Sequence, residues 1–124
     1  MPKSAIVSIV DDDEAVRVSV GALVRSMGHV ARPFPSAEDF LSSPELETSN
    51  CLILDVQMPG MTGVELQRVL VTNGRNLPII FITAYSQDRI RNEVFAAGAC
   101  CLLGKPCDGD QLVACIESAI SSQG

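Results

Sequence analysis

The chain has 124 residues, of which 47 % are hydrophobic and 19 % charged. This length and composition fit one compact domain and exclude a disordered or fibrous chain. Nine Lys and Arg residues against 15 Asp and Glu residues give a formal net charge of −6, which opposes direct binding to nucleic acid or to an anionic membrane surface.

Short apolar runs alternate along the chain with longer segments whose apolar residues recur at helical spacing. The first helical segment begins at Glu14 and stops at Gly28, and Asp12 or Asp13 is its expected N-cap. Residues 42–50 are polar and predict a loop. In chain order, the predicted elements are a strand at 5–10, a helix at 14–27, a weak strand at 29–33, a short helix at 36–41, a strand at 51–54, a helix around 64–70, a strand at 78–82, a helix around 90–97, a strand at 100–103 and a helix at about 109–121.

This order is five strand–helix units. Strands joined by helical crossovers run parallel, and a parallel sheet needs helices on both of its faces. The sequence therefore predicts an α/β fold: a single-domain, flavodoxin-like (βα)5 doubly wound sandwich with a five-stranded parallel sheet. In such sheets the ligand site lies beyond the carboxyl ends of the strands, near the point where the strand order reverses.

Five cysteines bear on the compartment in which the chain works: Cys51, Cys100, Cys101, Cys107 and Cys115. They form no C-x-x-C pair, and an odd number does not suit a disulfide framework. We therefore expect buried free thiols in a reducing, cytoplasmic compartment. A thiol or metal-redox role for Cys100, Cys101 and Cys107 is the alternative. Uncharged stretches such as 94–103 are well short of the ~18 to 20 apolar residues that a membrane span needs.

Polar residues stand at the carboxyl ends of four predicted strands. Two carboxylates about 4 Å apart repel by roughly 4 kcal/mol at an effective dielectric constant of about 20, so an acidic group at this edge needs a cation. A divalent ion and a lysine would supply the positive charge, and magnesium suits carboxylate and carbonyl oxygens. The residues are Asp11, Asp12 and Asp13 after the first strand, Asp55 after the third, Thr83 after the fourth and Lys105 after the fifth.

A carboxylate in such a setting can act as a nucleophile towards a phosphoryl group. The product is an acyl phosphate, and catalysis of the transfer is mainly positioning and charge neutralisation. Asp55 provides a nucleophile, Thr83 a hydroxyl group and Lys105 a fixed cation, while the pair Asp11 and Asp12 provides metal ligands.

Four motifs in this order and spacing resemble the receiver domain of bacterial two-component response regulators, and the likeness covers essentially all of residues 1–124. They are Val10-Asp11-Asp12-Asp13, the run from Leu54 to Gly63, Ile82-Thr83-Ala84 and Gly104-Lys105-Pro106. Residues 13–17 and 36–41 are similar to the FixJ-like branch, in which a receiver precedes a helix-turn-helix DNA-binding domain of the NarL/LuxR type. We therefore expect the N-terminal part of a longer transcriptional regulator, with a stand-alone receiver as the alternative.

The resemblance implies that Asp55 accepts a phosphoryl group from the phosphohistidine of a sensor histidine kinase. It also implies that Asp11, Asp12, Asp55 and the backbone carbonyl of Gln57 hold Mg²⁺ or Mn²⁺.

The resemblance further implies contacts to the phosphoryl oxygens from Thr83, from Lys105 and from the backbone amide of Ala84. It raises the expectation of a cis peptide bond before Pro106.

Phosphorylation is expected to act as a switch, because it adds about −1.5 to −2 charges beside Lys105 and Thr83. In receiver domains an aromatic residue three positions before the lysine commonly changes its side-chain position on phosphorylation. In this chain the position is occupied by Leu102, which has no polar tip. We expect Leu102 either to be a core or packing residue or to move inward as a switch residue. The surface formed by the last two long helices and the last strand is expected to respond, as a homodimer contact.

Gln57 and Tyr85 flank the path of attacking water in receivers, and Tyr85 is expected either to shield the phosphoryl group or to be an exposed loop aromatic. A carboxylate-nucleophile phosphatase is the closest enzyme alternative. Such enzymes usually carry an acid two positions after the nucleophile, where this chain has Gln57, so we expect a phosphoacceptor and not an enzyme. A mononucleotide-binding flavodoxin-like protein is disfavoured, because the aspartates after the first strand would repel phosphate.

Overall fold

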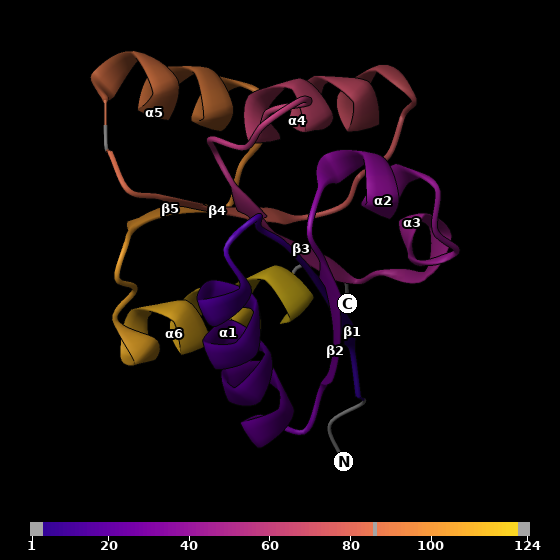
Figure 1. The fold of residues 1–124 in the computed structure, drawn as a ribbon, viewed down its shortest axis with the longest axis vertical. Helices are drawn as coiled ribbons and strands as arrows, with labels where there is room; N and C mark the ends of the chain where they lie inside the picture. The colour runs from indigo at the N-terminus through magenta and orange to yellow at the C-terminus, as the bar shows by residue number, and fades with distance from the viewer. Residues whose placement is uncertain (1–3, 86, 122–124) are drawn as a thin grey trace.

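The computed structural model describes residues 4–85 and 87–121, and within them five parallel strands form one sheet in the order β2-β1-β3-β4-β5 (Figure 1). This topology is the doubly wound (βα)5 arrangement that the sequence predicts. The strands are β1 (Ile6–Val10), β2 (Val30–Phe34), β3 (Cys51–Asp55), β4 (Ile79–Thr83) and β5 (Cys101–Gly104). The helices are α1 (Glu14–Ser26), α2 (Ala37–Leu41), α3 (Glu45–Thr48), α4 (Gly63–Thr72), α5 (Asp88–Ala96) and α6 (Gly109–Ser121).

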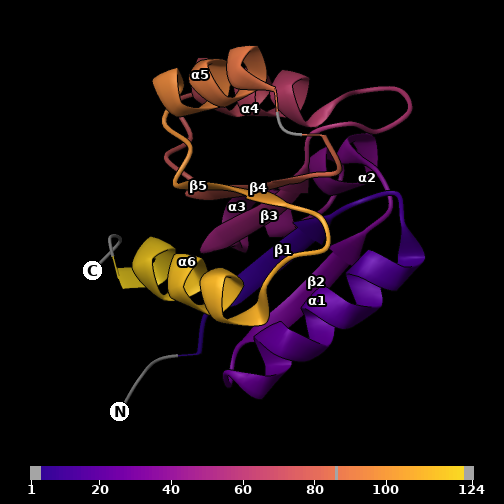
Figure 2. The ribbon, with the colours of Figure 1, turned by 90° about the vertical axis from the view of Figure 1, so that its left-hand side faces the viewer.

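Helices cover both faces of the sheet and divide the core into two layers. Figure 2 shows α1 and α6 on one side of the strands and α4 and α5 on the other. Every residue of β3 and β4 is buried, which explains why these strands read as continuous apolar runs and not as alternating patterns. Phe81 and Leu54 belong to the layer beneath α4 and α5, whereas Ile53 and Ile80 belong to the layer beneath α1 and α6.

The short helix α3 corrects the prediction of a loop at residues 42–50. It is a single turn in which the Thr48 hydroxyl donates to the Pro44 carbonyl and the Ser49 hydroxyl donates to the Glu45 carbonyl. An element of this length shows no helical periodicity, so the pattern of apolar residues could not reveal it. The strand bounds differ from the predicted ones by about one residue at each end.

Side-chain caps fix where the helices that follow the strand ends begin. Asp13 caps α1, because its carboxylate accepts a hydrogen bond from the backbone N–H of Ala15. Thr62 and Glu65 form a reciprocal capping box at the start of α4. Both caps set the length of the loop between a strand end and the next helix.

Gly63 allows α4 to begin directly against the end of β3. Its N–H donates to the carbonyl of Val56, and a Cβ at this position would overlap the backbone carbonyl oxygen of Asp55 and lie 3.1 Å from Val56 Cα. Only a residue without a side chain fits this approach.

Substitution Gly63→Ala is therefore expected to lower the free energy of unfolding by about 1 to 3 kcal/mol, because backbone must move to admit the methyl group. Gly109→Ala is the matched control: it also begins a helix, but a Cβ there meets no atom within 4 Å. Its expected change is under about 1 kcal/mol. Urea unfolding compares the two, and equal stability of both variants would contradict this account of Gly63.

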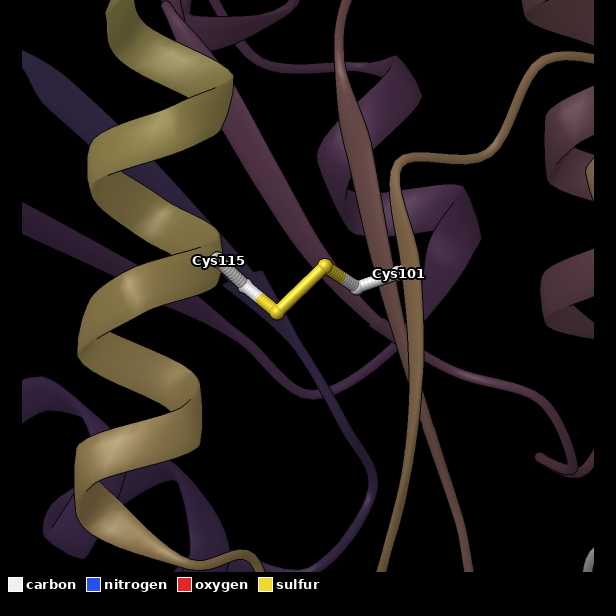
Figure 3. The surroundings of a disulfide bond; sticks show 2 residues. All are labelled: Cys101 and Cys115. Carbon is white, nitrogen blue, oxygen red and sulfur yellow. A yellow bond between two sulfur atoms is a disulfide. The ribbon is translucent and has the colours of Figure 1, made fainter.

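The cysteines correct the prediction of five free thiols. Cys101 and Cys115 form a disulfide between β5 and α6, as Figure 3 shows. Among the free cysteines, Cys51 is buried, but Cys100 is exposed and Cys107 is partly exposed. The pairing depends on α6 packing over the start of β5, and cysteine spacing does not report such packing.

In the part of the chain that the structure describes, none of the helices combines the length and the apolar character needed to cross a bilayer.

Candidate functional site

The carboxyl ends of the strands gather the polar residues that the sequence singled out. β1 and β3 are neighbours at the point where the strand order reverses, so Asp11, which follows β1, lies beside Asp55, which ends β3. Thr83 ends β4, and Lys105 follows β5. The parallel sheet thus brings these residues to one edge.

Lys105 joins the two buried aspartates. Its Nζ lies 2.9 Å from Asp11 Oδ2 and 3.2 Å from Asp55 Oδ2. Asp11 is 0 % exposed and Asp55 is 4 % exposed, so water contributes little to neutralising either carboxylate. The backbone N–H of Lys105 donates to the carbonyl of Thr83, which ties the start of the loop after β5 to the end of β4.

The pKa of Asp55 is raised from 3.8 to about 6. Burial is the largest cause and the charge of Asp11 adds to it, whereas Lys105 and the N–H of Gln57 act in the opposite direction. Burial also acts to lower the pKa of Lys105, but the hydrogen bond and charge of Asp11 and the charge of Asp55 outweigh it, so this pKa is raised. Lys105 therefore stays charged, while Asp55 binds a proton in weakly acidic solution.

The acidic residues have donor atoms placed for a divalent cation. Asp11, Asp12 and Asp55 each offer a carboxylate oxygen, and these oxygens lie within 4.8 Å of one another. Asp11 Oδ2 is buried and lies 2.9 Å from Lys105 Nζ, and among the described residues it accepts no other hydrogen bond. A buried carboxylate oxygen with unused acceptor capacity is suited to a hard cation such as Mg²⁺. The residues present therefore fit a magnesium site.

Gln57 lies immediately outside this cluster. It is exposed, and its backbone N–H donates to Asp55 Oδ1 at 3.3 Å. This bond turns the start of the loop after β3 back towards the carboxylate.

The Thr83 hydroxyl is held in a local turn. It donates to the carbonyl of Tyr85 at 2.9 Å and accepts from the N–H of Tyr85 at 3.1 Å. Its hydrogen bonds in the described chain are therefore to the loop and not to Asp55. Ala84 is exposed, and the Tyr85 side chain is 69 % exposed, so its ring lies at the surface.

Leu102 and Pro106 lie on either side of the site lysine along the chain. Leu102 is partly buried and packs on the core layer beneath α4 and α5. The Lys105–Pro106 peptide bond is cis. Pro106 lines a hollow between α1 and α6 together with Val20 and Leu112.

Two supporting residues were not found from the sequence. Arg17 donates from a guanidinium nitrogen to the backbone carbonyl of Asp11 at 2.7 Å and so holds the loop after β1. Glu38 of α2 accepts from the N–H of Met61 at 3.1 Å and so holds the loop after β3. Both are charged residues on helix surfaces, and no spacing rule separates them from solvated side chains.

A family model described as the response regulator receiver domain matches residues 7–117. Response regulator protein TodT of Pseudomonas putida is 36 % identical over 118 residues, which are 95 % of this chain and 52 % of TodT. Transcriptional regulatory protein FixJ of Azorhizobium caulinodans is 32 % identical over 120 residues, which are 97 % of this chain and 57 % of FixJ.

The solved structure of FixJ-N superposes with a TM-score of 0.85 at 34 % identity, covering 98 % of this chain and 96 % of that chain. The chain spans about half the length of the curated relatives that it matches. Fold, strand-end residues and family model agree, and the chain belongs to the response regulator receiver domains of two-component systems.

Proposed function

We propose that Asp55 is a phosphoacceptor that takes a phosphoryl group from the phosphohistidine of a sensor histidine kinase. The observation that carries this proposal is the placement of Lys105 Nζ between Asp11 Oδ2 and Asp55 Oδ2 at the carboxyl edge of the sheet. A fixed cation beside a buried carboxylate offsets the negative charge that an incoming phosphoryl group brings.

The transfer uses the ionised form of Asp55. One carboxylate oxygen bonds to phosphorus while the phosphorus–nitrogen bond of the donor breaks, and the histidine keeps the electron pair. Asp11, Asp12, Asp55 and the backbone carbonyl of Gln57 would hold Mg²⁺ or Mn²⁺. When bound, the ion neutralises charge on the phosphoryl oxygens. Lys105 stays protonated through the transfer and holds a phosphoryl oxygen.

The Thr83 hydroxyl and the Ala84 amide are the proposed partners of the remaining phosphoryl oxygens. To donate to one of them, the Thr83 hydroxyl must give up the hydrogen bond that it donates to the carbonyl of Tyr85. That exchange loosens the loop after β4 and frees space into which Leu102 can move. Tyr85 would slow hydrolysis by covering the phosphoryl group.

The responding surface in this proposal is formed by α5, β5 and α6, which are the last two long helices and the last strand of the sequence-based expectation. Phosphorylation would promote a homodimer through this surface. An effector domain in the same polypeptide, of the DNA-binding transcription type, would then receive the signal. We place the chain in the cytoplasm, where a sensor kinase would present its phosphohistidine.

Intact-protein mass after exposure to acetyl phosphate tests the proposal. The wild-type chain is expected to gain one phosphoryl group only when Mg²⁺ is present, and hydroxylamine is expected to remove it, because an acyl phosphate is labile to that nucleophile. Asp55→Asn should gain nothing. Asp88→Asn, which changes an exposed aspartate at the start of α5, is the matched control and should behave as wild type. Equal labelling of Asp55→Asn and wild type would overturn the assignment of Asp55.

A further inference from the structure

The disulfide between Cys101 and Cys115 encloses the segment that carries the site lysine. Cys101 is the first residue of β5 and Cys115 lies within α6, and their Cα atoms are 6.4 Å apart with a sequence separation of 14. Figure 3 shows the bond crossing directly from the strand to the helix. Lys105 and Pro106 lie in the loop that this bond closes. The bond therefore limits how far β5 and α6 can shift against each other.

The disulfide would restrict the movement of β5. This strand stands at the edge of the sheet and pairs with β4. Cys101 and Leu103 pack on the core layer beneath α1 and α6, whereas Leu102 packs on the layer beneath α4 and α5. The disulfide thus anchors one face of a strand whose other face carries the residue that we expect to move after phosphorylation.

Two of the three remaining cysteines are weak competitors for this pairing. Burial, with the charge of Cys100 as a smaller cause, raises the pKa of Cys51 to about 12. Burial also raises the pKa of Cys107. Because the thiolate is the attacking species in exchange, both thiols react slowly near neutral pH. Cys100 is exposed and adjacent to Cys101, and it provides a matched control.

We propose that Cys101 and Cys115 form a reversible thiol–disulfide site whose closed state restrains the response of β5 and α6 to phosphorylation. This inference rests on the proposed function, both for the phosphorylation of Asp55 and for the cytoplasmic location. Disulfides in a reducing cytoplasm are usually transient and redox-sensing, not structural. Cys101 is partly exposed on the edge strand, and the proposal expects an external thiolate to reach its sulfur.

The reductant is a dithiol. Its thiolate attacks the Cys101 sulfur, and the Cys115 sulfur leaves with the electron pair and takes up a proton. The second thiol of the reductant then displaces Cys101, so that the reductant becomes a disulfide and the protein gains two hydrogens. Hydrogen peroxide reverses the change: one thiolate forms a sulfenic acid, the other displaces its oxygen as water, and two thiols plus one peroxide yield one disulfide and two waters.

The test compares peroxide-treated and dithiothreitol-treated protein without denaturant. Intact mass is expected to differ by two hydrogens, and the difference should persist in Cys100→Ser but vanish in Cys115→Ala. Each form is then treated with acetyl phosphate and Mg²⁺, and amide hydrogen exchange is measured over residues 101–121. The change in exchange rate on phosphorylation is expected to be at least about fivefold larger in the reduced form.

Equal responses of the oxidised and reduced forms would overturn the restraint. Reduction that succeeds only after unfolding, or no mass difference at all, would overturn the site itself. These readings do not depend on a variant that fails to fold, because chemical reduction opens the bond in the wild-type chain. If neither form gains a phosphoryl group, the proposed function fails and the restraint with it, while the mass difference still tests the redox site separately.

Discussion

Replacing Lys105 with alanine is expected to lower the free energy of unfolding by about 3 kcal/mol near neutral pH when no divalent cation is added. The substitution leaves two buried carboxylates, Asp11 and Asp55, facing each other without the ammonium group that lies 2.9 and 3.2 Å from them. Removing one partner of a buried ion pair is costly because the remaining charge is neither solvated nor paired.

The loss is expected to depend on pH. Lys105 lowers the pKa of Asp55, so without it that pKa rises above its present value of about 6. In weakly acidic solution Asp55 is then neutral and the penalty is small, and the penalty grows as the pH rises and Asp55 ionises. Urea unfolding at several pH values measures this slope.

Arg68→Ala is the control for the lysine substitution. Arg68 pairs with Glu93, but its side chain is 68 % exposed, so the expected loss is under about 1 kcal/mol at every pH. A Lys105→Ala loss as small as that of Arg68→Ala, with no dependence on pH, would contradict the geometry described for the site.

Magnesium is expected to stabilise the chain, and to do so more strongly at neutral than at acidic pH. At about a hundredfold excess over its dissociation constant, a ligand that binds only the folded state adds about 2.7 kcal/mol. The acidic cluster of Asp11, Asp12 and Asp55 is expected to bind the ion in its ionised form, so protons would compete with it.

The expected pH dependence of the magnesium effect follows from the pKa of Asp55, which is raised from 3.8 to about 6 on folding. Without the ion, the folded state holds a proton that the unfolded state has already lost between these values. The contribution of Asp55 to stability is therefore highest below its unfolded pKa and falls as the pH rises through its folded pKa. Mg²⁺ replaces that proton, so its effect becomes full only above about pH 6.

Thermal unfolding with and without Mg²⁺ measures the effect. Asp12→Asn is expected to lose most of it, whereas Glu117→Gln, which neutralises an exposed residue of α6, should keep it. Equal stabilisation of both variants, or a larger effect in acid than at neutral pH, would contradict a cation site at this edge.

The strands and the long helices could be predicted because burial leaves a direct pattern in the sequence. β3 and β4 are buried along their whole length, and α1 and α6 carry one apolar face. The edge strand β2 gave a weaker signal, because Arg32 and Pro33 within it are exposed. The single turn α3 is too short to leave a helical pattern in the sequence.

The proximity of the site residues could also be predicted, because parallel strands end at one edge. Each site residue follows or ends an apolar run of the sequence. The parallel sheet brings the ends of these runs to one edge, which is where Asp11, Asp55, Thr83 and Lys105 lie. The sequence could not show that the Thr83 hydroxyl turns to the backbone of Tyr85, since that contact depends on loop geometry.

The disulfide was missed for a different reason. Whether Cys101 meets Cys115 depends on how α6 lies over β5, and this is a tertiary contact between two residues 14 positions apart in the sequence. The odd number of cysteines pointed away from pairing, although it fits one disulfide and three free thiols equally well. Arg17 and Glu38 likewise reach the site loops from helix surfaces, and the motifs that contain them did not indicate these loop contacts.

The position of the phosphoryl group within the chain tests the central claim most directly. Borohydride reduces an acyl phosphate to an alcohol, so treatment of the phosphorylated chain marks the acceptor residue with a permanent change of mass. Peptide mapping is expected to find this change at Asp55 alone, and only in protein that received both acetyl phosphate and Mg²⁺. A mark at Asp11, at Asp12 or at a residue away from the strand ends would contradict the account.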